Sequence, residues 1–426
     1  MSPPASAPRR IAIIGAGPAG LTAAEYLSAR GFQVDIFEKM PTPGRKFMMA
    51  GRGGLNLTHS EPLPAFLGRY REASDWLGPV IVRHDPGAVT AWCEGLGQAV
   101  FTGTSGRVFP EAMKASPLLR AWRKRLETQG VSLHLRHAWT GWSSDGALSF
   151  ETPEGAVSHT ADAVLLALGG ASWPRLGSDG AWLALLQREG VAAVALTSSN
   201  CGVEVDWSET VRTRFAGAPL KTIALALGDE GGAGEERVTG EAIIARYGLE
   251  GGAVYALSAP LRAALAAGGP ARLRLDLKPN EETQALAAKL GKAKKGQSLA
   301  NTLRKAGLAP AAVAVLRDGA AGDLPREPQA LAALIKAVPL TVTAQRGLER
   351  AISSAGGIAR EAVDENFMLK AKPGVFAAGE MLDWDAPTGG YLLQACFATG
   401  MAAARGVEDW LASGSSDRSA TLHPSP

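Results

Sequence analysis

The chain has 426 residues, of which 46% are hydrophobic and 20% are charged, and its formal net charge is +3. This size predicts a large hydrophobic core in two or three domains, and so small a charge does not by itself indicate nucleic-acid binding. The first residues lack an apolar signal sequence, and no run of about eighteen apolar residues is present, so we expect a cytoplasmic enzyme. Cys93, Cys201 and Cys396 are too widely spaced to predict a disulfide framework, a zinc site or a redox pair.

A strand, a glycine turn, a helix and a second strand are predicted in residues 10–39. Residues 11–14 are apolar and suit a buried parallel strand, apolar residues recur at helical spacing from residue 21, and residues 32–37 form the second strand. Between the first strand and the helix, three glycines have G-x-G-x-x-G spacing: Gly15, Gly17 and Gly20. This arrangement is typical of a dinucleotide-binding fold.

Each part of this fingerprint has a physical task. Gly15 permits the tight turn, Gly17 lets the backbone approach a pyrophosphate, and Gly20 lets the helix pack closely on the sheet. Free N–H groups at the helix start face the phosphate oxygens. The carboxylate of Glu38, at the end of the second strand, is placed to accept hydrogen bonds from ribose hydroxyls, which argues against a 2′-phosphate. The alternative is a chance glycine pattern in a loop.

The segment 41–60 is rich in glycine and cations and poor in acids. Its backbone can run closely against a flat ring at three glycines, Gly51, Gly53 and Gly54. Positive charge for a diphosphate or an anionic reduced ring comes from Arg45, Lys46 and Arg52. A solvated surface loop is the alternative.

The middle of the chain changes character. Residues 131–142 lead into a predicted hairpin through 143–146, and residues 161–170 form an apolar strand that ends in glycines. Short alternating stretches at 222–227, 242–245 and 272–277 then predict an antiparallel sheet, followed by helical pieces over 281–336. Lys289, Lys292, Lys294 and Lys295 form a basic cluster, which is either a solvated helix face or an RNA contact.

A second strand-to-helix junction lies near the end of the chain. Residues 374–380 form a buried strand, residues 387–391 form a glycine-rich loop, and an apolar helix begins near Leu392. The positive end of that helix can face a developing negative charge. Candidate catalytic residues are Arg52, which would fix an anionic substrate, His59 as acid or base, and Tyr391 as a hydrogen-bond donor; each also has a reading as a packing residue.

These motifs together resemble a known family. They are GAGPAG with Glu38, then residues 44–58, GRVFP at 106–110, LGGAS at 168–172, SAGGI at 354–358 and residues 378–391. In this order they resemble the three-domain bacterial NAD(P)/FAD-dependent oxidoreductases, which include aminoacetone oxidase, a bile-acid dehydro-steroid reductase and a ribosomal-RNA dihydrouridine synthase. The resemblance spans nearly the whole chain.

The resemblance implies an α/β fold with a Rossmann-like, glutathione-reductase-type FAD-binding domain built from both chain ends. That domain would occupy residues 1–190 and 346–412. A β-rich domain at 191–279, to which residues 335–345 return, and a small helical domain at 280–334 would be inserted. Residues 413–426 are expected to be a disordered tail.

The resemblance also implies which residues hold a non-covalent FAD. Gly15, Gly17, Ala19 and Gly20 would hold the pyrophosphate, Glu38 the adenosine ribose, and the backbone of Trp139 would lie near the adenine. Gly379 and Glu380 would meet the ribityl and phosphate region, with Arg45 and Lys46 along the cofactor. Residues 51–56, including Leu55 and Asn56, would wrap the isoalloxazine together with Thr388, Gly389, Gly390, Tyr391 and Leu392. Further expected cofactor neighbours are Pro18, Lys39, Gly44, Ala167 and Gly169.

Two departures from the family pattern affect the substrate side of the flavin. The loop reads GRGGLN at 51–56 where many members have GGGRCN, and the last helix reads YLLQACFATG where relatives often carry an asparagine after the tyrosine and a tryptophan near Cys396. The resemblance therefore implies a divergent subgroup with an altered substrate face.

We expect an FAD-dependent oxidoreductase that transfers hydride to or from a small organic substrate, by reducing an activated C=C bond or oxidising an amine. A single dinucleotide fingerprint is visible, so NADH or NADPH would visit the flavin only transiently as electron donor. Two alternatives remain, a flavin-dependent RNA-modifying reductase that uses the basic cluster, and a flavin-carrying partner protein without turnover.

Overall fold

The computed structural model describes residues 8–228, 236–294, 296–320 and 322–420. The chain divides into two compact units. The first unit contains residues 1–197 and 353–426, and the second contains residues 198–352. These boundaries fall at 197/198 and 352/353, whereas the sequence predicts them at 190/191 and 345/346.

A five-stranded parallel sheet lies at the centre of the first unit. Its order is β19 (Val375–Ala377), β10 (Ala163–Leu166), β1 (Arg10–Ile14), β2 (Gln33–Glu38) and β6 (Ser132–Leu135). In the register, Ile11 pairs with Ala163 on one side and Val34 on the other. Residues 11–14 are at most 1% exposed. The sheet is covered on both faces, which is why its strands read as continuous apolar runs.

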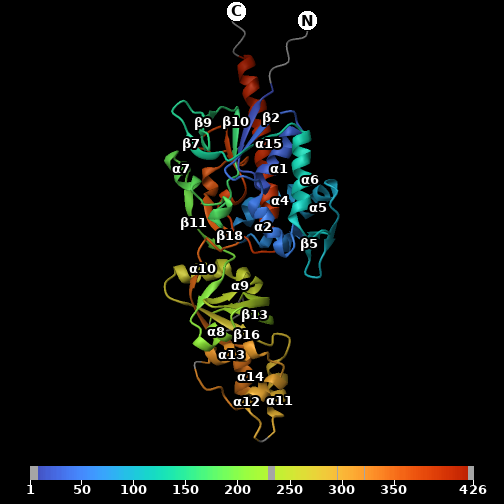
Figure 1. Cartoon of the computed structure of the whole chain (residues 1–426), viewed down its shortest axis with the longest axis vertical. Coiled ribbons are helices and arrows are strands. Elements are labelled where there is room, and N and C mark those ends of the chain that lie inside the picture. The colour runs from blue at the N-terminus through green and yellow to red at the C-terminus, as the bar shows by residue number, and fades with distance from the viewer. Residues whose placement is uncertain (1–7, 229–235, 295, 321, 421–426) are drawn as a thin grey trace, which may run out of the picture. The chain divides into compact units, whose positions relative to one another are not determined.

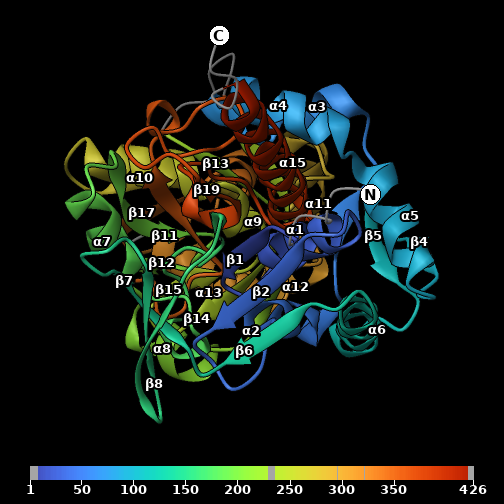
Figure 2. The same cartoon turned by 90° about the horizontal axis from the view of Figure 1, so that it is seen from above.

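Two helices from opposite ends of the chain pack together beside this sheet. They are α1 (Pro18–Ser28) and α15 (Tyr391–Ala420), which lie next to each other in both views (Figures 1 and 2). The Tyr26 hydroxyl on α1 donates to Glu408 Oε2 on α15 at 2.7 Å. The first unit is therefore built from both chain ends, as predicted.

The other elements of the first unit surround this layer. The helices and short 3-10 turns are α2 (Arg45–Ala50), η1 (Gly51–Gly53), α3 (Leu63–Gly68), η2 (Arg71–Ala73), α4 (Ser74–Arg83), α5 (Pro86–Gly95), α6 (Ala115–Thr128), η3 (Pro174–Leu176), α7 (Trp182–Arg188), η4 (Arg360–Ala362) and η5 (Gly379–Met381). The remaining strands are β3 (Thr58–His59), β4 (Val100–Thr102), β5 (Arg107–Pro110), β7 (Ala138–Trp142), β8 (Leu148–Thr152), β9 (Gly155–His159), β11 (Ala193–Ser199) and β18 (Ser353–Ile358). The predicted hairpin through 143–146 is confirmed as the β7–β8 pair.

The second unit contains a closed antiparallel barrel. Its strand order is β12 (Val203–Val205), β15 (Gly248–Glu250), β14 (Arg237–Ala245), β13 (Pro219–Leu227), β16 (Ala271–Asp276) and β17 (Val338–Gln345). The three stretches predicted as antiparallel strands lie in β13, β14 and β16, and β17 returns to the barrel beside β12 and β16. Closure leaves the barrel without a free edge.

The predicted helical pieces belong to the same unit as the barrel. The unit's helices are α8 (Glu209–Arg214), α9 (Gly252–Ala256), α10 (Ser258–Ala266), α11 (Thr283–Gly291), α12 (Leu299–Lys305), α13 (Pro310–Gly319) and α14 (Pro328–Lys336). Buried side chains of α14, such as Leu331 and Ile335, share one hydrophobic core with Leu275 and Val338 of the barrel. That shared core is the reason that sheet and helices form one compact unit where the sequence predicts two domains.

The last helix is longer than predicted. Helix α15 runs to Ala420, into the segment that the sequence predicts to be disordered from residue 413 onward. Extending an existing helix adds one hydrogen bond for each residue fixed, which lowers the cost of these last turns. Residues 421–426 lie outside the described part of the chain. Among the described residues, none of the helices combines the length and apolar character needed to cross a membrane.

Candidate flavin site

The glycine turn between β1 and α1 has the shape that a dinucleotide needs. Gly15 has φ +106°, and a Cβ there would lie 2.3 Å from the Ala167 carbonyl oxygen. A Cβ on Gly20 would lie 2.1 Å from the Gly15 oxygen. At Gly17, in contrast, a Cβ would meet nothing within 4 Å. Gly15 and Gly20 are therefore needed for packing, while Gly17 borders open space.

The start of α1 offers free backbone donors beside that open space. The first helical hydrogen bond runs from the Leu21 N–H to the Gly17 oxygen at 2.9 Å. Pro18 occupies the first helical position and has no N–H. The N–H groups of Ala19 and Gly20 precede that first bond and are not used within the helix, so they are available to an anion.

Glu38 is held at the end of β2 by two backbone donors. Its carboxylate accepts hydrogen bonds from the Ala16 N–H at 3.0 Å and the Met40 N–H at 2.9 Å. Burial raises the pKa of Glu38, although these two hydrogen bonds act in the opposite direction. Each oxygen keeps a second lone pair, so the fixed carboxylate can still accept a ribose hydroxyl.

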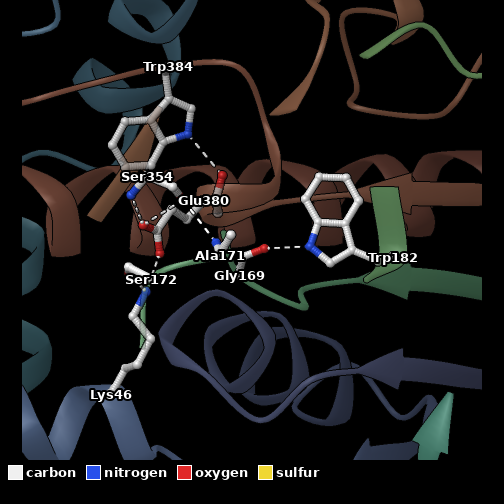
Figure 3. Close-up of polar contacts among 9 residues, drawn as sticks. Lys46, Gly169, Ala171, Ser172, Trp182, Ser354, Glu380 and Trp384 are labelled. Atoms are coloured by element: carbon white, nitrogen blue, oxygen red, sulfur yellow. Dashed lines mark hydrogen bonds and ion pairs between the residues drawn. The ribbon is translucent and has the colours of Figure 1, made fainter. Parts of the chain in front are cut away.

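A charged pair connects α2 with η5 (Figure 3). Lys46 Nζ lies 2.7 Å from Glu380 Oε2 and donates to Ser172 Oγ at 2.7 Å. The other carboxylate oxygen of Glu380 accepts the Ser354 N–H at 2.8 Å, and the Ser354 hydroxyl accepts the Ala171 N–H at 3.0 Å. The network gathers four separate segments of the chain around one carboxylate. Sequence reasoning did not select these two serines as site residues, although Ser172 lies in the LGGAS motif and Ser354 lies in the SAGGI motif.

The glycine-rich segment packs against the start of α6 and against Met113, just before it. A Cβ on Gly51 would lie 2.8 Å from Ala115, and one on Gly54 would lie 2.6 Å from Met113 Cε. Gly53 has nothing within 4 Å of its Cβ position. Arg52 belongs to η1, but its side chain lies outside what the structure describes. The segment is therefore packed on one side and open at Gly53.

The loop before α15 approaches the same segment. Gly389 has φ +137° and Gly390 has φ +99°, and a Cβ on Gly390 would lie 2.5 Å from Thr58 Cα. The Thr58 hydroxyl donates to Gln394 Oε1 at 2.7 Å, and Gln394 Nε2 donates to the His84 oxygen at 2.5 Å. Thr58 and Gln394 are buried and join the two ends of the chain here, a contact that sequence reasoning missed.

His59 and Tyr391 lie together, but their polar atoms are bonded to the protein. The rings stack with centroids 5.5 Å apart. His59 Nδ1 accepts the Glu61 N–H at 3.1 Å, so Nε2 carries the proton toward the Ser105 oxygen at 2.9 Å. The Tyr391 hydroxyl donates to Glu61 Oε1 at 2.5 Å. Burial raises the pKa of Tyr391, as does its hydrogen bond to Glu61, which keeps the phenol protonated.

The remaining predicted cofactor neighbours lie in the first unit. Lys39 pairs with Asp179 at 2.6 Å, the Gly169 oxygen accepts the Trp182 indole N–H at 2.8 Å, and the Gly379 oxygen accepts that of Trp384 at 2.8 Å. Ala167 follows β10 and donates its N–H to the Ile14 oxygen, Gly44 has φ +64° before α2, and Leu392 follows Tyr391 in α15. Thr388 lies in the loop before α15.

Buried polar atoms without a protein partner test the fit of a dinucleotide cofactor. Three of them belong to residues predicted to line it, namely Arg45 Nε, Asn56 Oδ1 and Trp139 Nε1. Buried polar groups are normally hydrogen-bonded, so unpaired atoms in these positions favour a polar ligand. Together with the open space at Gly17 and the fixed carboxylate of Glu38, they fit an extended dinucleotide.

Comparison with known proteins gives the same assignment. The chain is 27% identical to a 3-dehydro-bile acid delta(4,6)-reductase of Clostridium scindens in an alignment of 419 residues that covers 94% of this chain and 99% of the relative. Among solved structures, a 3-ketosteroid delta1-dehydrogenase from Sterolibacterium denitrificans superposes with a TM-score of 0.52 at 12% identity, covering 94% of this chain and 99% of that one. A flavocytochrome c3 fumarate reductase superposes with a TM-score of 0.50 at 16% identity, covering 95% and 79%. At these identities the two structures share the fold alone.

The family model described as HI0933-like protein Rossmann domain matches residues 9–406. Its cofactor is FAD, and the protein is an FAD-dependent oxidoreductase. The chain belongs to the HI0933-like family of Rossmann-fold flavoproteins.

Proposed function

We propose that this enzyme transfers hydride from its reduced FAD to a small organic substrate and thereby reduces a C=C bond activated by a conjugated carbonyl. The observation that carries the proposal is the match to the bile-acid delta(4,6)-reductase, which extends over both units and 99% of that relative. A match confined to the nucleotide-binding fingerprint would support cofactor binding only.

Bound FAD supplies the hydride chemistry, and the residues of the chain bind and orient it. The N–H groups of Ala19 and Gly20 would hold the pyrophosphate, and Glu38 the adenosine ribose. The first turn of α15 would stabilise negative charge on the reduced ring, because its N–H groups lie at the positive end of a long helix.

The polar contacts of the candidate catalytic residues support binding and positioning roles. The Tyr391 phenol holds its proton toward Glu61, and His59 uses both ring nitrogens within the protein. The substrate proton would then come from solvent, while NADH or NADPH would act as a transient electron donor.

The basic cluster at residues 289–295 is weaker support for an RNA substrate than the match to the reductase is for a small organic substrate. Lys289 pairs with Glu281 at 2.6 Å, so part of the positive charge is neutralised. Lys295 lies outside the described residues. The experiment described next therefore also tests for RNA binding.

The test begins with the visible spectrum of the purified protein and an anaerobic titration with NADH and NADPH. The reduced enzyme is then mixed with a steroid carrying a 3-oxo-4,6-diene, with a primary amine added to the oxidised enzyme in parallel. Reoxidation by the dienone supports the proposal. Bleaching by the amine instead would favour an amine oxidase, salt-sensitive retention of RNA with uridine reduction would favour the RNA enzyme, and no electron exchange at all would favour a carrier.

A further inference from the structure

The first residue of α15 is clamped from several directions. Tyr391 is 4% exposed, and its ring stacks on His59 with an interplanar angle of 21°. The Tyr70 hydroxyl donates to the Tyr391 carbonyl at 2.7 Å. A Cβ on Gly389 would lie 2.7 Å from Tyr391 Cε2, so the preceding glycine is needed for this ring position. The aromatic ring thus anchors the start of the helix.

A carboxylate and a guanidinium hold the other end of that ring. Arg69 donates to both oxygens of Glu61, from Nε at 3.1 Å and from Nη2 at 2.7 Å. Glu61 Oε1 also accepts the Tyr391 hydroxyl at 2.5 Å. The Glu61 side chain is 12% exposed and that of Arg69 is 50% exposed. A two-point contact with arginine fixes the carboxylate plane, and the fixed carboxylate fixes the phenol.

We propose that Glu61, held by Arg69, is a positioning residue that anchors Tyr391 and so sets the position of the first turn of α15 against the flavin ring. The inference rests on the placement of the isoalloxazine at residues 388–392, which is part of the proposed function. The effect of a helix end on a charge falls off within the first turn. A small displacement of this turn therefore weakens the stabilisation of the reduced ring and lowers its reduction potential.

A second cluster of the same chemistry provides a matched control. The Tyr26 hydroxyl donates to Glu408 Oε2 at 2.7 Å, and Arg30 Nε lies 3.0 Å from the same oxygen. This group also ties α15 to another element, but at Glu408, seventeen residues beyond Tyr391 in the helix. Its loss removes the same kind of contact without touching the helix start.

The experiment measures the reduction potential of the FAD-loaded protein by equilibration with reference dyes. Tyr391→Phe removes the hydroxyl and keeps the ring, Glu61→Ala removes its acceptor, and Glu61→Gln keeps an acceptor oxygen. We expect Tyr391→Phe and Glu61→Ala each to lower the ratio of reduced to oxidised FAD about tenfold at a given applied potential. For a two-electron couple this ratio corresponds to a reduction potential that is about 30 mV lower. Glu61→Gln should shift the reduction potential less. The double variant Tyr391→Phe/Glu61→Ala should shift the potential no further than either single variant, and Tyr26→Phe should leave it unchanged.

An unchanged potential in FAD-loaded Tyr391→Phe would overturn the inference. So would an equal shift in Tyr26→Phe, because it would show a general loosening of α15. Tyr391→Phe decides the question by itself if Glu61→Ala does not fold, since the buried ring is retained. The potential is measured without substrate, so a failure to reduce dienones would refute the proposed function and leave this inference standing.

Discussion

Two glycines of the same fingerprint should respond in opposite ways to substitution. Gly17 is the N-cap of α1, with φ −85° and ψ −178°, and a Cβ there meets nothing within 4 Å. Aspartate suits this extended N-cap conformation and places its charge at the positive helix end. Gly17→Asp should therefore stabilise the FAD-free protein slightly, by about 0.5–1 kcal/mol.

The same aspartate should strongly weaken FAD binding. Its carboxylate would occupy the space assigned to the pyrophosphate, and two like charges about 5 Å apart repel by roughly 3 kcal/mol at an effective dielectric constant of about 20. That is more than a hundredfold in affinity. A variant that gains stability while losing its cofactor separates binding from folding.

Gly20→Ala should behave differently because its Cβ would lie 2.1 Å from the Gly15 oxygen. Overpacking against backbone costs up to about 3 kcal/mol, and the better helix propensity of alanine returns about 1 kcal/mol. We expect a net loss of about 2 kcal/mol in the free energy of unfolding.

The assay is urea unfolding of the FAD-free protein followed by tryptophan fluorescence. Nine of the ten tryptophans lie in the first unit, all except Trp207, so the signal reports the unit that carries both glycines. FAD affinity is measured separately by equilibrium dialysis. Wild-type FAD affinity in Gly17→Asp would refute the assignment of the pyrophosphate to this turn, and wild-type stability in Gly20→Ala would refute the packing argument.

Three further predictions concern single side chains. Glu380→Gln should destabilise the FAD-free protein by about 1.5–3 kcal/mol, because it replaces the charge-assisted bond from Lys46, and the same urea titration checks this. Burial raises the pKa of Cys93 to about 12, so this thiol should stay unreactive toward a disulfide reagent at neutral pH until the protein is unfolded; fast labelling of the native protein would contradict this. Burial by itself would raise the pKa of Glu61, but the hydrogen bonds from Arg69 and Tyr391 outweigh burial and hold this pKa below its ordinary 4.5. The stability that Glu61 contributes is therefore present above pH 4.5 and is lost as the pH falls through the lower folded value, so wild type and Glu61→Gln should converge in urea midpoint on acidification, and a constant gap would argue against it.

Local sequence patterns were enough to predict the βαβ segment at the centre of the first unit. The apolar run 11–14, the three spaced glycines and Glu38 lie within one βαβ segment, so their roles follow from backbone geometry and short-range contacts. The structure gives each glycine the environment that its task requires, with tight contacts at Gly15 and Gly20 and open space at Gly17.

Contacts between distant segments were not predictable in this way. Lys46 meets Glu380, which is 334 positions away, and Glu61 meets Tyr391, which is 330 positions away. Single residues of these types occur throughout the chain, and no local periodicity marks which of them will meet. The alternating pattern did predict the strands of the β-rich region. The closure of these strands into a barrel, however, depends on a long-range contact, in which β17 returns to β12.

The sequence by itself thus determined the dinucleotide turn, because glycine spacing and strand polarity act over a few residues. The resemblance of its motifs to a known family added the FAD cofactor and the union of both chain ends in one unit. Only the tertiary structure decided how the polar groups of the candidate site pair with one another. It paired Glu380 with Lys46 and Ser354, and it bonded the Tyr391 hydroxyl to Glu61. Such choices depend on which side chains satisfy one another's hydrogen bonds once the segments have packed.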